Sequence, residues 1–234
     1  MADISTLLDR LTIATDVAFN NKIEKHSKQS YDGKVDIQFG IYKGTESYNK
    51  DYNGMLTINL KPSHQGIDWG VNFNIFSTKI HKGYQKEWNK YGKKILSYIF
   101  EDSILSKALS TYGVIISGKS KGAGEAQVFA YNILKNDLLP KGRIKLLGCL
   151  SSPKVLCKEY AKYLSAELNK EIYLTSYKNE IVTGVVPGFT RPEGFFCQIG
   201  KRTFPISIKD HILATTKEKY IYDAIENMRK ELKS

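Results

Sequence analysis

The sequence predicts an α/β fold in which a mainly parallel β-sheet is covered by helices on both faces. Short apolar segments suited to strands alternate along the chain with longer segments that carry apolar residues at helical spacing. Residues 113–117 form a short apolar run, typical of a strand buried on both faces of a parallel sheet. With 234 residues, 41% of them hydrophobic, the chain can bury one substantial core. We therefore expect residues 1–234 to form a single domain.

The first elements are an amphipathic helix and two strands. Apolar residues at helical spacing predict a helix over residues 4–18, with Asp3 as its N-cap. The polar stretch 20–34 is interpreted as a loop. Alternating apolar residues then predict strands over residues 35–41 and 55–60.

The middle of the chain supplies two more helices and two buried strands. Residues 71–75 fit either a short strand or a loop over a pocket, and residues 84–100 have a helical apolar face with lysines opposite it. We expect those lysines to be solvated. The strand at 113–117 leads through a tight turn into a helix that ends near Leu134, and residues 143–150 repeat the strand pattern.

The last third continues the alternation. It predicts a helix over residues 155–168, a strand over 171–176, a hairpin around Gly200 and Lys201, and a final helix over about 216–230. Strands that alternate with helices favour parallel pairing through right-handed connections.

Residues 118–122 read Gly-Lys-Ser-Lys-Gly and match the GxSxG pattern, in which a serine sits on a strained turn between a strand and a helix. Gly118 and Gly122 leave room for that turn. The pentapeptide alone is common by chance, but this one follows a buried strand and precedes a helix. The sequence therefore predicts an α/β-hydrolase fold with Ser120 as the nucleophile.

A serine nucleophile needs a histidine base and an acid that orients the base. Hydrolases of this fold use the chain order serine, acid, histidine, so His211 is the eligible base. Its alternative interpretation is an exposed loop histidine. Glu180, just after the strand at 171–176, is our choice for the acid. Four other carboxylates stay open, namely Glu167, Glu171, Glu193 and Asp210.

Four ordered motifs resemble the class 3 lipases, the fungal-type triacylglycerol lipase family. They are Leu60-Lys61-Pro62-Ser63 followed by Asp68-Trp69, then Ile80-His81-Lys82-Gly83-Tyr84, then residues 116–122, and finally Asn179-Glu180-Ile181-Val182.

The resemblance implies roles for individual residues. It matches the nucleophile to Ser120, the acid to Glu180 and the base to His211. It also implies an oxyanion hole made by the Ser63 hydroxyl and the backbone N–H of Lys121. By the same resemblance His81 is structural, and residues 64–73 correspond to the lid.

This chain departs from the family pattern at the nucleophile. Lys119 and Lys121 stand where the family usually has His and Leu, and Glu180 stands where it has Asp. The two lysines either favour an anionic headgroup or point outward as solvated charges.

The leading hypothesis is a serine ester hydrolase that acts on a lipid, a phospholipid or another carboxylic ester without a cofactor. The net charge of +11 favours peripheral contact with anionic membrane surfaces. The alternative is an inactive lipase-like binding or scaffold protein. Nucleic-acid binding through residues 82–98 is a weaker hypothesis, because no recognised motif supports it.

The cysteines and the N-terminal residues bear on disulfide formation, metal binding and cellular location. Cys149, Cys157 and Cys197 show no CxxC spacing, which argues against a disulfide framework or a zinc site, and Cys149 is expected to be a buried thiol. No apolar run approaches the roughly 20 residues of a membrane span, and residues 1–20 lack the pattern of a signal peptide. We expect a cytoplasmic protein, with export by a non-classical route left open.

Overall fold

A single seven-stranded sheet organises the computed structural model, which describes residues 4–33, 35–61, 79–169, 171–177, 188–200 and 217–232. The spatial order of the strands follows their order in the chain, β1 to β7. The first three strands pair antiparallel, and every neighbouring pair from β3 onward is parallel. The mainly parallel sheet predicted from the sequence is confirmed. The strands are β1 (Ile23–Tyr31), β2 (Val35–Tyr42), β3 (Leu56–Lys61), β4 (Val114–Lys119), β5 (Ile144–Leu150), β6 (Ile172–Tyr177) and β7 (Phe195–Ile199).

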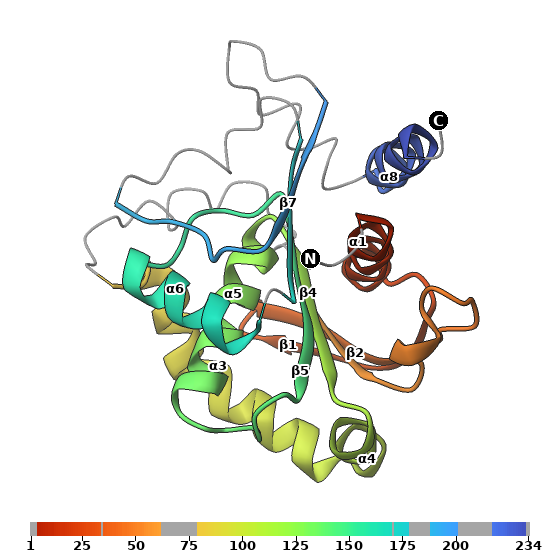
Figure 1. Ribbon diagram of the computed structural model, residues 1–234. Coiled ribbons are helices and arrows are strands. Elements are labelled where there is room, and N and C mark those ends of the chain that lie inside the picture. The colour runs from red at the N-terminus through yellow and green to blue at the C-terminus, as the bar shows by residue number, and fades with distance from the viewer. Residues whose placement is uncertain are drawn as a thin grey trace.

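Helices cover both faces of the sheet. Figure 1 shows α1 and α8 beside one face, and α3, α5 and α6 beside the other. None of the helices in the described ranges is both long enough and apolar enough to cross a bilayer. The helices are α1 (Ile4–Phe19), α3 (Lys82–Glu101), α4 (Ser103–Thr111), α5 (Lys121–Lys135), α6 (Lys158–Glu167) and α8 (Lys219–Glu231), with a short 3₁₀ helix, η1 (Lys50–Tyr52).

The sheet separates two hydrophobic cores, and alternate side chains of its central strands point into one or the other. In β4, Val114 and Ile116 face the larger core, which α3, α4, α5 and α6 share. Ile115 lies between them in sequence and packs in the smaller core with α1 and α8. Successive side chains of a strand point to opposite faces, so a strand buried on both faces needs apolar residues at every position. This explains the apolar run that the sequence shows at residues 113–117.

The interpretation of residues 20–34 as a loop was wrong. Strand β1 occupies Ile23–Tyr31 and pairs antiparallel with β2 at the edge of the sheet. Its sequence is almost entirely polar, and most of its residues are exposed or half-buried. An edge strand that carries lysines is soluble and resists pairing with other chains, which removes the apolar alternation used to recognise strands.

Two helix boundaries also differ from the expectation. The helix expected to end at residue 100 is followed at once by a separate helix, α4, because the Asp102 carboxylate accepts hydrogen bonds from the amides of Ile104 and Leu105 and caps a new start. Helix α6 begins at Lys158 and not at 155, since Leu156 forms isolated bridges with Ile80 and Thr190. The segment 71–75 and Lys201 of the expected hairpin lie outside the described residues.

Most aromatic residues of α3 pack against the core, whereas Phe100, near the end of the helix, is half exposed. Tyr84 and Tyr91 are buried, and Trp88 packs edge-on against Phe129 of α5. Rings held in this way cannot stack on nucleic-acid bases, which is the interaction that single-strand binding requires. The lysines of α3 therefore coat a packing helix, as expected from the sequence.

Helix α8 is held on α1 by buried polar contacts. The Asp16 carboxylate of α1 accepts hydrogen bonds from the hydroxyls of Tyr42, at 2.7 Å, and Tyr222, at 2.5 Å. Arg229 of α8 donates to the Asp9 carboxylate of α1 at 2.7 Å. Burial raises the pKa of Asp16, whereas the two tyrosine hydroxyls act in the opposite direction. These contacts fix the helix that follows the segment containing His211.

Tyr222→Phe is expected to destabilise the protein by about 1–3 kcal/mol, because it removes one of the two hydroxyls that solvate a buried carboxyl group. Urea unfolding followed by circular dichroism would measure the change. Tyr220→Phe is the matched control, since its hydroxyl has no hydrogen-bond partner within the described part of the chain. Equal unfolding free energies for the two variants would contradict the role assigned to Asp16.

Candidate active site

Strand β4 ends in a turn that holds Ser120 in a strained conformation. Its backbone has φ 55° and ψ −123°, the region of the first central residue of a type II′ turn, which glycine favours. The Ser120 N–H donates to the carbonyl of Leu150 at 2.9 Å, and its carbonyl accepts from the N–H of Ala123 at 3.0 Å. Neighbouring strand β5 and helix α5 therefore clamp the turn from both sides.

The two glycines of the motif make this turn possible. A Cβ on Gly118 would lie 2.4 Å from the carbonyl carbon and oxygen of Gly122. A Cβ on Gly122 would lie 2.0 Å from the carbonyl oxygen of Leu60 in β3. Both distances are too short for any side chain, so α5 can begin this close to the sheet only where residues 118 and 122 are glycine. The geometry matches the tight strand–turn–helix expected from the GxSxG pattern.

Lys119 and Lys121, on either side of Ser120, are not simple solvated charges. The Lys119 ammonium lies 3.9 Å from the centroid of the Phe19 ring, a cation–π contact with α1. Burial, and to a lesser extent the nearby Lys61, lower the pKa of Lys119 to about 8, whereas Glu218 acts in the opposite direction. Lys119 is therefore partly neutral in mildly alkaline solution.

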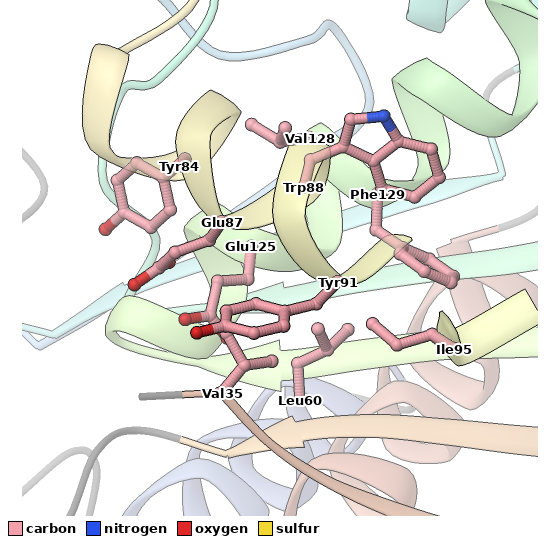
Figure 2. A pocket seen from close by; sticks show the side chains of 10 residues that line it. All are labelled: Val35, Leu60, Tyr84, Glu87, Trp88, Tyr91, Ile95, Glu125, Val128 and Phe129. Atoms are coloured by element: carbon pink, nitrogen blue, oxygen red, sulfur yellow. The ribbon is translucent and has the colours of Figure 1, made fainter. Parts of the chain in front are cut away.

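Lys121 is buried in an ion cluster under the first turn of α5. Its ammonium lies 3.0 Å from the carboxylates of both Glu87 on α3 and Glu125 on α5, and its side chain is 12% exposed. Figure 2 shows the two glutamates beside Tyr84 and Tyr91 in a cavity of about 20 Å³, enough for one water molecule. The residue that supplies the expected oxyanion amide is thus tied through its side chain to a second helix.

Glu125 holds its proton into the neutral range. Burial raises its pKa to about 8, with Lys121 opposing the shift and Glu87 adding to it. Two carboxyl groups share one ammonium here, so the site cannot neutralise two full negative charges.

The raised pKa of Glu125 predicts a stability that falls with pH. A carboxyl group ionises near pH 4.3 when unfolded and near pH 8 in this site, so the folded state binds the extra proton between these values. The stabilisation is complete below the unfolded pKa and is lost as the pH rises through the folded one, with a slope of up to about 1.4 kcal/mol per pH unit. Glu125→Gln is expected to flatten this slope in urea unfolding measured from pH 5 to 9. Glu226→Gln, at an exposed position of α8, should leave this slope unchanged. Parallel curves for the wild type and Glu125→Gln would contradict the raised pKa assigned to Glu125.

The sequence matches the family model described as lipase, class 3, over residues 25–189, which is more than half of the chain. The chain belongs to the class 3 lipases. No curated protein matches it.

Solved structures agree with this class 3 lipase assignment at the level of the fold. The triacylglyceride lipase of Rhizomucor miehei superposes with a TM-score of 0.65 at 16% identity, covering 85% of this chain and 82% of that one. A lipase from Rhizopus microsporus var. chinensis has a TM-score of 0.65 at 13% identity over 91% and 87% of the two chains. A triacylglycerol lipase described as having a serine protease triad has a TM-score of 0.62 at 15% identity over 91% of each chain. The predicted family and α/β-hydrolase fold are confirmed.

Several site residues expected for a class 3 lipase lie outside the described residues. These are Ser63, Glu180 and His211, together with the lid segment 64–73. The ends of the elements beside them are described. Strands β3, β4 and β6 run parallel within one sheet, so the chain leaves all three at the same edge, before Ser63, Ser120 and Glu180 respectively.

Three of the alternative acids lie at the opposite end of the parallel strands, where the strands begin. Glu171 immediately precedes β6 and forms an ion pair with Arg10 at 2.5 Å. Glu167 is the last residue of α6 and pairs with Lys141 at 3.5 Å, and Glu193 precedes β7. All three stand before a parallel strand begins, whereas Ser120 stands where one ends. Glu180 and Asp210 are the candidates that this geometry leaves.

Two of the upstream histidines have structural contacts of their own. The Nδ1 atom of buried His81 accepts a hydrogen bond from the N–H of Gly83 and caps α3. His26 on edge strand β1 pairs with Asp102 at 2.6 Å. The structural role expected for His81 fits this arrangement.

The two carboxylate partners of Lys121 were not predicted from the sequence. Glu125 follows Lys121 by four positions on a predicted helix, and this spacing indicates an ion pair. The contact with Glu87 could not be predicted, because Glu87 lies on another helix, among lysines that were interpreted as solvated.

Proposed function

We propose that the protein is a serine ester hydrolase that cleaves lipid or phospholipid carboxylic esters with Ser120 as its nucleophile. The observation that carries the proposal is the strained backbone of Ser120, with φ 55° and ψ −123°, at the tip of β4. Such a conformation costs about 1–3 kcal/mol and persists where the surrounding structure imposes it, commonly at active sites. The turn places Ser120 just beyond the carboxyl end of β4, the position of the nucleophile in α/β-hydrolases, and the residue is 8% exposed.

In the proposed reaction the Ser120 hydroxyl attacks the ester carbonyl carbon while His211 accepts its proton. The tetrahedral intermediate then expels the alcohol, which takes that proton from His211, and an acyl ester remains on Ser120. A water molecule gives a proton to His211 and attacks the acyl carbonyl, and the carboxylic acid leaves as the proton returns to Ser120. Glu180 orients His211 and stabilises its cation.

The oxyanion of each tetrahedral intermediate needs hydrogen-bond donors. We assign this role to the hydroxyl of Ser63, just beyond β3, and to the backbone N–H of Lys121, the first residue of α5. A donor of this kind contributes about 3 kcal/mol to transition-state stabilisation. The helix dipole adds to it, because the first turn of a helix carries partial positive charge.

Labelling with a fluorophosphonate tests the proposal directly, since the reagent phosphonylates only an activated serine. Mass spectrometry should find one adduct per chain, on the peptide that contains Ser120. Ser120→Ala should remain unlabelled, and Ser110→Ala, which alters an exposed serine of α4, should react like the wild type. A folded wild type that takes up no label would instead support the inactive scaffold.

A further inference from the structure

Four lysines lie on one face of the sheet beside the nucleophile turn. In β3 and β4, the side chains of Asn59 and Ser117 point to α1, where they donate to the carbonyls of Ala18 and Ala14. Lys61 and Lys119 each follow one of these residues by two positions, so they face the same way. Both stand at the carboxyl ends of their strands, past the C-terminal end of α1.

Edge strand β1 adds two lysines to this face. Lys28 pairs with Gln38 of β2, which pairs with Asn59 of β3, so all three lie on the α1 side of the sheet. The register shift between Lys25 and Ser27 returns Lys25 to that side as well. Lys25 and Lys28 are both exposed. We call Lys25, Lys28, Lys61 and Lys119 the basic face.

Two acidic residues act on the basic face: Asp36, which lies opposite Lys61 in the β2–β3 register, and Glu218, which acts on Lys119. Neighbouring Lys22 and Lys43 are matched by the carboxylates of Glu46 and Glu24. None of the four lysines of the basic face forms an ion pair within the described ranges of the chain. The charges of the exposed Lys25 and Lys28 are therefore available to a ligand in solution.

The lysines of the basic face also repel one another. Burial lowers the pKa of Lys61 first, and the charges of Lys28 and Lys25 lower it further, while Asp36 acts in the opposite direction. Burial is also the main cause that lowers the pKa of Lys119; Glu218 acts in the opposite direction, and Lys61 adds a smaller lowering. A bound anion would relieve this repulsion, because an opposite charge favours the protonated form.

We propose that the basic face binds the anionic headgroups of a lipid surface and so brings the Ser120 edge of the sheet against the lipid. The choice of a lipid partner rests on the proposed function, since the face adjoins the nucleophile turn of a class 3 lipase. Nucleic acid is the less favoured partner, because Tyr84 and Tyr91 of α3 are buried, and the exposed Phe100 belongs to a helix on the opposite face of the sheet from the four lysines.

Sedimentation with vesicles tests the proposal. The protein is used with Ser120→Ala, so that no lipid is consumed, and binding to phosphatidylglycerol–phosphatidylcholine vesicles is compared with binding to pure phosphatidylcholine. We expect binding to the anionic vesicles alone, weakening as salt is added. Lys25→Gln with Lys28→Gln should weaken it by about 25-fold, or about fivefold per lysine. Lys93→Gln with Lys94→Gln removes the same charge from α3, on the other face, and should change binding by less than about twofold.

Separate readouts distinguish this proposal from the proposed function. With Ser120 intact, Lys25→Gln with Lys28→Gln should hydrolyse a soluble short-chain ester like the wild type. An inactive protein that still binds anionic vesicles through the basic face would refute only the hydrolase. Equal weakening by the control pair, or no vesicle binding at all, would overturn the lipid-binding proposal. Displacement from vesicles by a single-stranded oligonucleotide that binds more tightly would reassign the basic face to nucleic acid.

Discussion

Ser120→Ala is expected to lower kcat/KM for a carboxylic ester by about 10⁴-fold or more, because it removes the hydroxyl oxygen that we propose forms the acyl-enzyme. The residual rate would come from the oxyanion donors and from substrate binding, neither of which the substitution touches. Steady-state hydrolysis of a soluble p-nitrophenyl ester and of a phospholipid would measure the loss. Ser110→Ala on α4 should be as active as the wild type. A Ser120→Ala protein that keeps more than a few per cent of the activity would require another nucleophile.

The strain at Ser120 extends this prediction to stability. Ser120→Gly should be as inactive as Ser120→Ala, yet it should raise the free energy of unfolding by about 1 kcal/mol, because glycine adopts φ 55° without the cost that a Cβ imposes. Alanine keeps the Cβ and should keep the strain. The comparison therefore separates the loss of the hydroxyl from the relief of the backbone. Identical unfolding curves for the two variants would contradict the claim that the turn is strained.

Gly122→Ala is expected to destabilise the protein by about 3–5 kcal/mol. The new Cβ would meet the backbone carbonyl of Leu60 at 2.0 Å, and β3 cannot yield because it is paired with strands on both sides. Helix α5 must move outward instead. This shift would also displace the Lys121 amide, the proposed oxyanion donor, relative to β4, so surviving activity should fall about 100-fold.

Gly142→Ala is the matched control for Gly122→Ala. Gly142 has φ +74°, and a Cβ there would have no atom within 4 Å, so the substitution carries backbone strain alone, worth about 1 kcal/mol. Thermal or urea unfolding of both variants gives the comparison, with ester hydrolysis as the second readout. A free energy of unfolding that Gly122→Ala lowers no more than Gly142→Ala does would show that Gly122 is not required for the close approach of α5 to β3.

Helices and strands with a regular pattern of buried apolar residues could be predicted from the sequence. Elements without such a pattern could not. Strand β4 and helix α5 were recognised because an apolar run leads into GxSxG and then into a helical pattern. Strand β1 was missed because an edge strand needs backbone pairing more than apolar side chains. Helix α4 was missed because a single cap, Asp102, separates it from α3 without any change in composition.

The candidate site shows the same division. Ser120 and its flanking glycines were predicted because local geometry dictates both residue types. The partners of Lys121 were not, because the contact with Glu87 joins two helices whose approach only the fold determines. A charged residue next to a nucleophile thus gave no indication of whether it faced solvent or the interior.

The position of α1 in the structure has a consequence for how the chain matures. Helix α1 precedes the whole sheet in sequence, yet it packs against β3 to β6 and against α8. During synthesis it therefore emerges long before the surfaces that cover Leu8, Leu11 and Val17 exist. The strands can pair in the order in which they are made, since each lies beside its predecessor. Helix α1 instead exposes its apolar side until these surfaces have been made. We therefore expect it to be a binding site for chaperones on the growing chain.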